Sequence, residues 1–244
     1  MSFSELNNAL AVQKRLYRGY GKIAKQQGLL TGVYRPVNAL APFDNKISEL
    51  FVIYTKDFNF KKLDKFGVPL MIGMFDGTGI QEGDYLVTPP EPNTLEYVDA
   101  DVFTKTGIVG RCDYFYVASM QSNSPVLLIE CQRTISVSCP TGPVGASGAT
   151  KGKLGYSGST RATETLLMAN IKASIQQGTK GETNPANLPL DIRMPWWTIT
   201  FPAISGVVID TGYFIRDDLG RKYVVSSPEL TDMGWRISAS YERV

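Results

Sequence analysis

The sequence predicts a mainly β protein, with one or two small antiparallel β-barrel or sandwich modules, an N-terminal α-helix and a long Gly/Ser-rich loop or arm. Three observations predict this class. Leucine and tyrosine recur at helical spacing near the start of the chain. Short β-branched and aromatic runs, separated by Gly, Pro and Asp, fill most of the rest. Residues 139–160 are crowded with Gly, Ser and Ala, which cannot build a core.

Residues 3–27 are predicted to form one amphipathic helix. Ser2 and Glu5 have the spacing of a capping box, and Gly28 suits a C-terminal stop. Glycine costs about 1 kcal/mol relative to alanine inside a helix, so Gly19 and Gly21 weaken its middle. The apolar positions at helical spacing are Leu6, Leu10, Leu16/Tyr17, Tyr20 and Ile23/Ala24.

Short strands are expected from Gly32 onwards. The density of turn residues between the β-prone runs is typical of a small antiparallel barrel or sandwich. A short second helix is predicted from about Thr163 to Gln176, on the spacing of its leucines and isoleucines. The β-prone runs are 33–36, 50–54, 70–75, 83–87, 114–117, 126–137, 196–201, 206–209, 213–215, 222–225 and 235–239.

The predicted domain order has four parts. They are the N-terminal helix (1–31), β-rich module 1 (32–138), a Gly-rich arm or linker (139–160), and a short helix plus β-rich module 2 (161–244). The two modules share a weak pattern: 116–119 matches 223–226, 83–87 matches 212–215, and the arginine-bearing run 131–136 matches 234–239. Both a duplication and one β-rich domain with a long loop fit this pattern.

Several function classes are excluded by composition. The chain has no histidine, which rules out Ser-His-Asp and Cys-His catalysis and every His-ligated metal site. Cys112, Cys131 and Cys139 match no zinc spacing, and we expect reduced thiols. We therefore predict a protein that is not an enzyme, with no catalytic residues, no cofactor and no metal. No run approaches the roughly 18 apolar residues of a membrane span, so no membrane partner is expected.

Carboxylates occur in two groups that deserve a functional interpretation. Asp210, Asp217 and Asp218 carry oxygen ligands of the kind that hard cations prefer, but turn geometry explains them equally. The second group could serve a hydrolase, because glycosidases use paired carboxylates, although no aromatic pocket is readable around it. Its members are Glu91, Glu96, Asp99 and Asp101.

The N-terminal helix carries a basic stripe, predicted to lie opposite its Leu/Tyr stripe. Its members, at spacings of one, three and four residues, are Lys14, Arg15, Arg18, Lys22 and Lys25. Three interpretations stay open: a solvated helix face, docking onto an acidic protein surface, and salt-sensitive contact with a DNA backbone. Trp196 and Trp197 are candidate interface residues. Adjacent strand residues face opposite sides, so one of the two is expected to fill the core and the other to serve as an interface anchor, a role that tryptophan favours.

Three stretches carry a resemblance. They are the helix entering 32–36, the run "GDYLV" at 83–87 that leads to "YFYVASMQ" (114–121) and "IECQRTISV" (129–137), and "DDLGRKYVVSSPELTDMGWRISA" (217–239). Together they resemble the structural proteins of tailed bacteriophage virions, in particular the head-completion, stopper and collar-like head-to-tail connectors of the neck. Typical stoppers are shorter, so this chain would be a two-module version.

The resemblance implies a homo-oligomeric ring. Such a ring stacks on the portal axis, contacts portal or adaptor and tail proteins, lines the DNA channel, and touches packaged DNA without sequence preference. The expected location is the virion, assembled in the host cytoplasm. A tail-tube or baseplate protein is the alternative within this class, and a tail-associated hydrolase is the alternative in a different class.

Overall fold

The computed structural model describes residues 3–55, 70–89, 112–120, 125–141, 163–177 and 196–241. These residues are mainly strands, as predicted, and they divide into two compact units. Unit 1 takes the described residues of 3–35, 45–55 and 70–130, and unit 2 takes 36–44 and those from Cys131 onwards.

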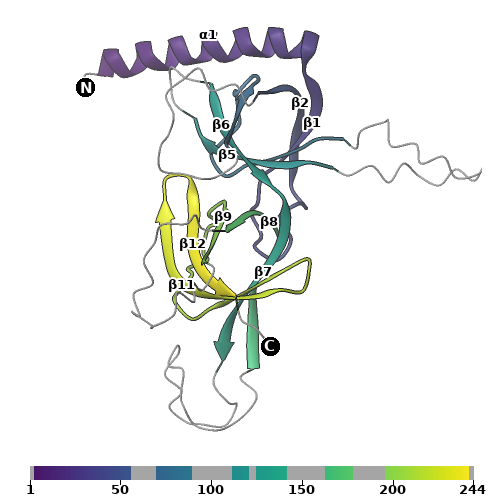
Figure 1. Ribbon diagram of the computed structural model, residues 1–244. Helices are drawn as coiled ribbons and strands as arrows, with labels where there is room; N and C mark the ends of the chain where they lie inside the picture. Colours follow the sequence, from purple (N-terminus) through teal and green to yellow (C-terminus); the bar gives the residue numbers. More distant parts are fainter. Residues whose placement is uncertain are drawn as a thin grey trace, which may run out of the picture. The chain divides into compact units, whose positions relative to one another are not determined.

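Unit 1 combines the N-terminal helix with a six-stranded closed barrel (Figure 1). The helix and strands are α1 (Phe3–Gln27), β1 (Leu29–Tyr34), β2 (Lys46–Thr55), β3 (Leu70–Met74), β4 (Tyr85–Val87), β5 (Tyr114–Ser119) and β6 (Val126–Cys131). The order around the barrel is β1-β2-β3-β6-β5-β4. Alternate residues such as Val33, Val52 and Leu86 point inward and form its core, because successive strand residues face opposite sides.

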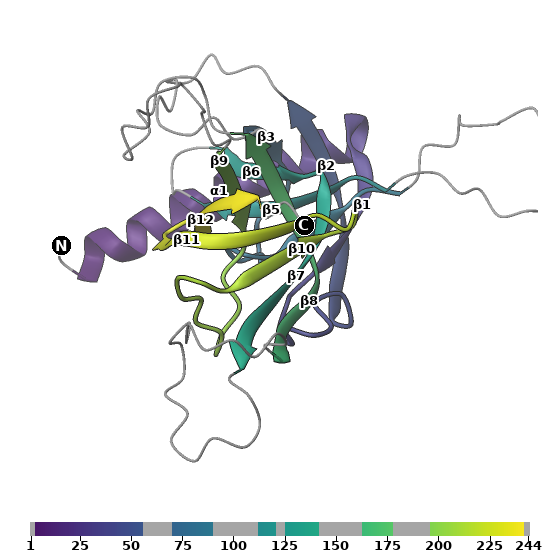
Figure 2. The same ribbon diagram turned by 60° about the horizontal axis from the view of Figure 1, so that its bottom comes forward.

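Unit 2 is a second six-stranded closed barrel. Its strands are β7 (Arg133–Thr141), β8 (Thr163–Gln177), β9 (Trp196–Phe201), β10 (Phe214–Asp217), β11 (Lys222–Thr231) and β12 (Gly234–Tyr241), in the order β7-β8-β9-β12-β11-β10. Figure 2 shows β7 between β8 and β10, its two antiparallel neighbours. The core contains Met168, Ile171, Phe201 and Ile237. Ala39 also packs on this core, and its carbonyl accepts a 2.9 Å bond from the Ala169 amide.

The two barrels have the same topology. Replacing each strand of unit 1 by the strand six places later converts one barrel order into the other. The agreement extends to single hydrogen bonds. In unit 1 the Gly83 amide donates to Val117 and the Val117 amide donates to Asp84. In unit 2 Gly212 donates to Val225, and Val225 donates to Tyr213. Gly83 and Gly212 both have a positive φ, which glycine adopts without strain.

This equivalence supports the duplication, and it corrects the alignment predicted from sequence. Val117 corresponds to Val225, so Tyr116 corresponds to Val224 rather than to Tyr223. The arginine-bearing run 131–136 was paired with 234–239, but it leads into β7, the first strand of unit 2. The true counterpart of β12 is β6. A two-residue sequence repeat is easily shifted, whereas paired backbone bonds fix the register.

The predicted helix from Thr163 to Gln176 is wrong, because this segment is strand β8. Asn170 has a positive φ of 56°, and the β7–β8 register shifts on either side of Val137. The irregularity places the buried apolar residues at Met168, Ile171 and Ala173, three and then two residues apart. The bulge thus interrupts the strict alternation of buried and exposed residues by which a strand is recognised in a sequence.

The predicted boundary between the modules, the linker interpretation of residues 139–160 and one predicted strand are contradicted by the strand assignment. The second barrel begins at Arg133, the first residue of β7, rather than after residue 138. The Gly-rich segment predicted at 139–160 therefore does not link the modules: Cys139–Thr141 end β7, and residues 142–160 lie outside the described ranges. Residues 206–209, predicted as a strand, belong to the connection between β9 and β10.

Candidate docking surface on the N-terminal helix

Helix α1 is held on unit 1 by a narrow stripe of small and aromatic residues. Tyr17, Gly21 and Ala24, spaced by four and three residues, are its buried positions. A Cβ at Gly21 would lie 2.8 Å from the Asp76 Cβ, and one at Gly77 would lie 2.9 Å from the Tyr17 ring. Glycine on both sides thus permits the helix to approach the β3–β4 connection closely. From the sequence, Gly21 was expected only to weaken the helix.

The five basic residues are all exposed on α1, as expected of a surface stripe. At 3.6 residues per turn, they cover an arc of roughly 100°. We predicted that this arc would lie opposite the buried stripe. It borders that stripe instead, because Lys14 and Lys25 fall beside Gly21 around the helix. The members are Lys14, Arg15, Arg18, Lys22 and Lys25.

A third face of α1 was missed by the sequence analysis. Val12, Leu16, Gly19 and Ile23 follow spacings of four, three and four residues, which place them on one side of the helix. Val12 is 53% exposed and Ile23 49% exposed, and a Cβ at Gly19 would meet nothing within 4 Å. The spacing was readable, but Leu16 and Ile23 had been assigned to the same stripe as Tyr17 and Ala24. We call these four residues the outer apolar stripe.

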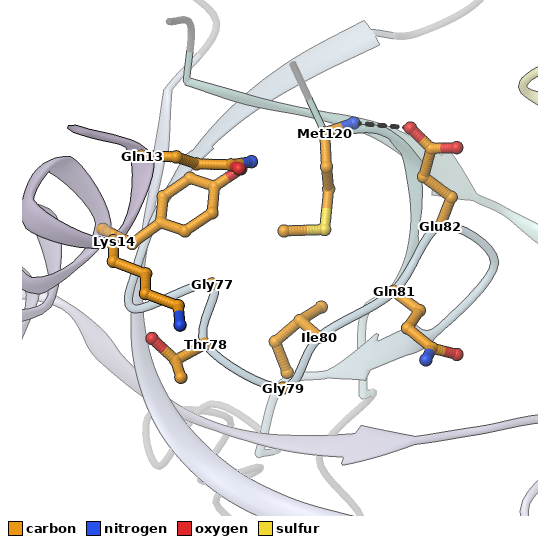
Figure 3. Close-up of a pocket in the computed structure, with 10 residues that line it drawn as sticks. Gln13, Lys14, Gly77, Thr78, Gly79, Ile80, Gln81, Glu82 and Met120 are labelled. Carbon is orange, nitrogen blue, oxygen red and sulfur yellow. Dashed lines mark hydrogen bonds between the residues drawn. The ribbon is translucent and has the colours of Figure 1, made fainter. Parts of the chain in front are cut away.

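A pocket of about 420 Å³ lies between α1 and the β3–β4 connection (Figure 3). Gln13 and Lys14 project from the helix, while Ile80 and Met120 supply apolar surface. Glu82 stands on the far side, where its Oε1 accepts a 2.8 Å bond from the Met120 amide. A small apolar floor with a polar rim can receive one side chain of a partner protein. The basic stripe reaches this rim through Lys14.

The two tryptophans lie at the start of β9 and play different parts. Trp197 packs against the barrel core, with its ring 5.7 Å from that of Tyr223 and the Arg221 guanidinium 5.3 Å from its centroid. Trp196 is half-buried and pairs in register with Ser240. The opposite facing of the two side chains follows from the strand geometry. Trp197 is therefore a core residue, and Trp196 remains the predicted interface residue.

Asp217 has a structural task at the β10–β11 turn. Its carboxylate accepts bonds from the Arg221 Nε at 2.7 Å, the Tyr223 hydroxyl at 3.2 Å and the backbone amides of Leu219 and Arg221. Burial raises the pKa of Tyr223 above its usual range. These donors occupy the oxygens that a cation would need. Within the described residues no group of three acidic or thiol side chains is placed to hold a metal.

The remaining predicted residues are the three cysteines and the acidic residues considered for a hydrolase. Cys112, Cys131 and Cys139 are not joined in disulfide bonds. The hydrolase candidates Glu91, Glu96, Asp99 and Asp101 lie outside the described residues. Within the described ranges, no helix combines the length and the apolar character of a membrane span.

Comparison with known proteins identifies no relative of this chain. No protein-family model, curated protein or solved structure matches the chain. The features that bear on function are therefore the two barrels, the surface of α1 and the stretches that carry the resemblance.

Proposed function

We propose that this protein is a non-enzymatic structural component of a tailed phage virion: a ring-forming head-to-tail connector that joins the portal to the tail and lines the DNA channel. The observation that carries this proposal is the repetition of one barrel topology in tandem. The resemblance concerns proteins built on a small barrel, and it predicted a two-module version. Two barrels of one topology are what such a version requires.

The stretches that carry the resemblance include some equivalent strands of the two barrels. "GDYLV" runs into β4 and "YFYVAS" is β5, while the stretch from Asp217 covers β11 and β12. The β4–β5 and β10–β11 pairs share the two backbone bonds described above. Among the strands in these stretches, β5 corresponds to β11, and β6, which ends in the stretch 129–137, corresponds to β12. The stretch 129–137 also spans the junction between the modules.

The basic stripe on α1 suits either neighbour that a connector would have. An acidic ring surface and a DNA backbone both attract five exposed cations, and both contacts weaken as salt is added. Sequence-independent binding is sufficient for a channel through which an entire genome passes. Of these two neighbours, we place the protein surface first, because the adjacent pocket at Lys14 can accept a side chain.

The proposal is tested in a phage that encodes the chain. A stop codon in its gene should yield DNA-filled heads and separate tails, and supply of the chain in trans should restore joined particles. Purified virions should contain the chain in several copies. Absence of the chain from virions would overturn the proposal. Complete particles carrying the chain only in the tail tube or baseplate would favour the alternative station.

A further inference from the structure

The two barrels differ in what covers one of their ends. In unit 1, α1 lies on the β3–β4 connection, where Tyr17 meets Gly77, and Met120 from the end of β5 lies beside it. The equivalent end of unit 2 is built from the β9–β10 connection and the β11–β12 hairpin. These two approach closely, since a Cβ at Gly234 would lie 2.5 Å from the Phe201 carbonyl oxygen.

The connections themselves correspond turn by turn. Ile80 donates its amide to the Gly77 carbonyl across Gly79, and Val207 donates to Ile204 across Gly206. Both of these glycines have positive φ values, 86° and 84°. The surface that α1 occupies in unit 1 thus has a counterpart in unit 2.

The exposed side chains of the two connections at this end of unit 2 are apolar and acidic. Val208 is 68% exposed in the β9–β10 connection, and Leu230 is 61% exposed in the β11–β12 hairpin. Asp210 follows Val208 by two residues and is exposed, as is Asp232 in the hairpin. An exposed valine and leucine among carboxylates invite a partner that is apolar and basic. We call Val208, Asp210, Leu230 and Asp232 the acidic barrel end.

The outward side of α1 has this complementary character. Val12 and Ile23 of the outer apolar stripe are about half exposed, and Arg15 and Lys22 lie next to that stripe around the helix. The helix surface is apolar and basic, and the barrel end is apolar and acidic, so the two are complementary. A second copy can bury both at once.

We propose that α1 of one copy docks through its outer apolar stripe and basic residues onto the acidic barrel end of the next copy. The contact joins different surfaces of two identical chains, so it is head-to-tail and closes into a ring when the rotation between copies permits. This inference rests on the proposed ring-forming function and names the surfaces that build the ring.

Charge reversal tests the contact on the full-length chain. Sedimentation velocity at low salt should show concentration-dependent association of the wild type. Arg15→Glu with Lys22→Glu should weaken it about tenfold or more, and so should Asp210→Lys with Asp232→Lys. Lys46→Glu on β2 is a charge-changing control, expected to associate like the wild type.

Mixing the two reversed proteins distinguishes contact between copies from contact within one chain. In an alternating assembly each reversed helix meets a reversed barrel end, and each native helix meets a native one. Association should therefore return in the mixture, although neither protein associates alone. Failure of the mixture to associate would overturn the proposal, provided that circular dichroism shows both variants folded.

The apolar half of the contact has a matched pair of variants. Val208→Asp should abolish association, whereas Val37→Asp, at a valine that is 66% exposed, should not. A wild-type chain that remains monomeric at all concentrations, or equal loss in both valine variants, overturns the inference. Neither result changes the outcome of the virion test. If the chain is present at the neck but makes no such contact, the proposed function stands and this interface is wrong.

Discussion

The Arg35–Asp84 pair shows how a single buried residue organises unit 1. Asp84 is 1% exposed, and both of its oxygens accept bonds from Arg35 at 2.8 Å. The Gln81 amide donates a third bond at 2.8 Å. Arg35 also reaches the Gly79 carbonyl, so one guanidinium connects the end of β1 to the β3–β4 connection. The pair thus fixes the loop against which α1 packs.

Removing the charge of Asp84 should destabilise unit 1. Asp84→Asn leaves Arg35 without its carboxylate partner, and breaking a buried pair costs about 3 kcal/mol. The measurement is the free energy of unfolding in urea. Glu49→Gln is the matched control, because it breaks the exposed Lys46–Glu49 pair in the same unit and should shift the midpoint little. Equal effects of the two substitutions would contradict this account.

Glu164 gives unit 2 a predictable dependence on pH. Hydrogen bonding to Arg216 is the main cause that lowers the pKa of Glu164 below its ordinary value of 4.5, with help from Ser138 and the charge of Lys222. A carboxylate with a lowered folded-state pKa stabilises the fold above its unfolded pKa. That stabilisation is lost as pH falls through the folded value.

The stability advantage of the wild type over Glu164→Gln should therefore be full at pH 7 and shrink below about pH 4.5. Urea midpoints measured from pH 7 to pH 3 test this expectation. In an Arg216→Gln background the main stabilising partner is absent, so Glu164→Gln should have a much smaller effect at every pH. A gap between wild type and Glu164→Gln that widens on acidification would show the sign to be wrong.

At the scale of the element, α1 was fully predictable and β8 was not. The sequence of this segment has regular apolar spacing, the Ser2 and Glu5 spacing of a capping box and a terminal glycine, all of which are local signals. In β8, the bulge at Asn170 interrupts alternation, so the pattern lacks the period of a strand. Its conformation comes from pairing with β7 and β9, which are distant in sequence. Local patterns do not contain that information.

The two glycines of α1 should respond oppositely to alanine. Gly21→Ala places a Cβ 2.8 Å from the Asp76 Cβ, so the helix must shift, and overpacking of this kind costs about 1–3 kcal/mol. Gly19→Ala points into open space and should stabilise the protein by up to about 1 kcal/mol through helix propensity. Thermal or urea unfolding compares the two. Stabilisation by both would mean that α1 does not lie against Asp76.

At the scale of the whole molecule, the sequence predicted the fold class but placed the modules imperfectly. Repeated short motifs suggested a duplication, yet they could not assign Cys131–Ser136 to the correct barrel. Consecutive strands β6 and β7 are separated by a single residue, so no composition change marks the boundary. The basic residues were likewise found from sequence, while the outer apolar stripe required knowledge of which helix face is buried.

The duplication has a consequence for assembly. The two barrels share one topology, so each copy has two equivalent barrel ends. In the described residues, one of these ends carries α1. The end of the second barrel carries no helix in the described residues, and the outer apolar stripe of α1 is exposed. Under the proposed function, this combination favours head-to-tail addition of one copy to the next. This arrangement connects the fold to the proposed ring.

The most direct test of the central claim is a symmetry-resolved image of the neck of the phage particle. The account predicts repeated copies of this chain around the channel axis between portal and tail, each showing two six-stranded barrels. The basic stripe of α1 should face either the channel or an acidic neighbouring ring. A neck whose density is fully explained by other chains, with this one absent from the particle, would contradict the account.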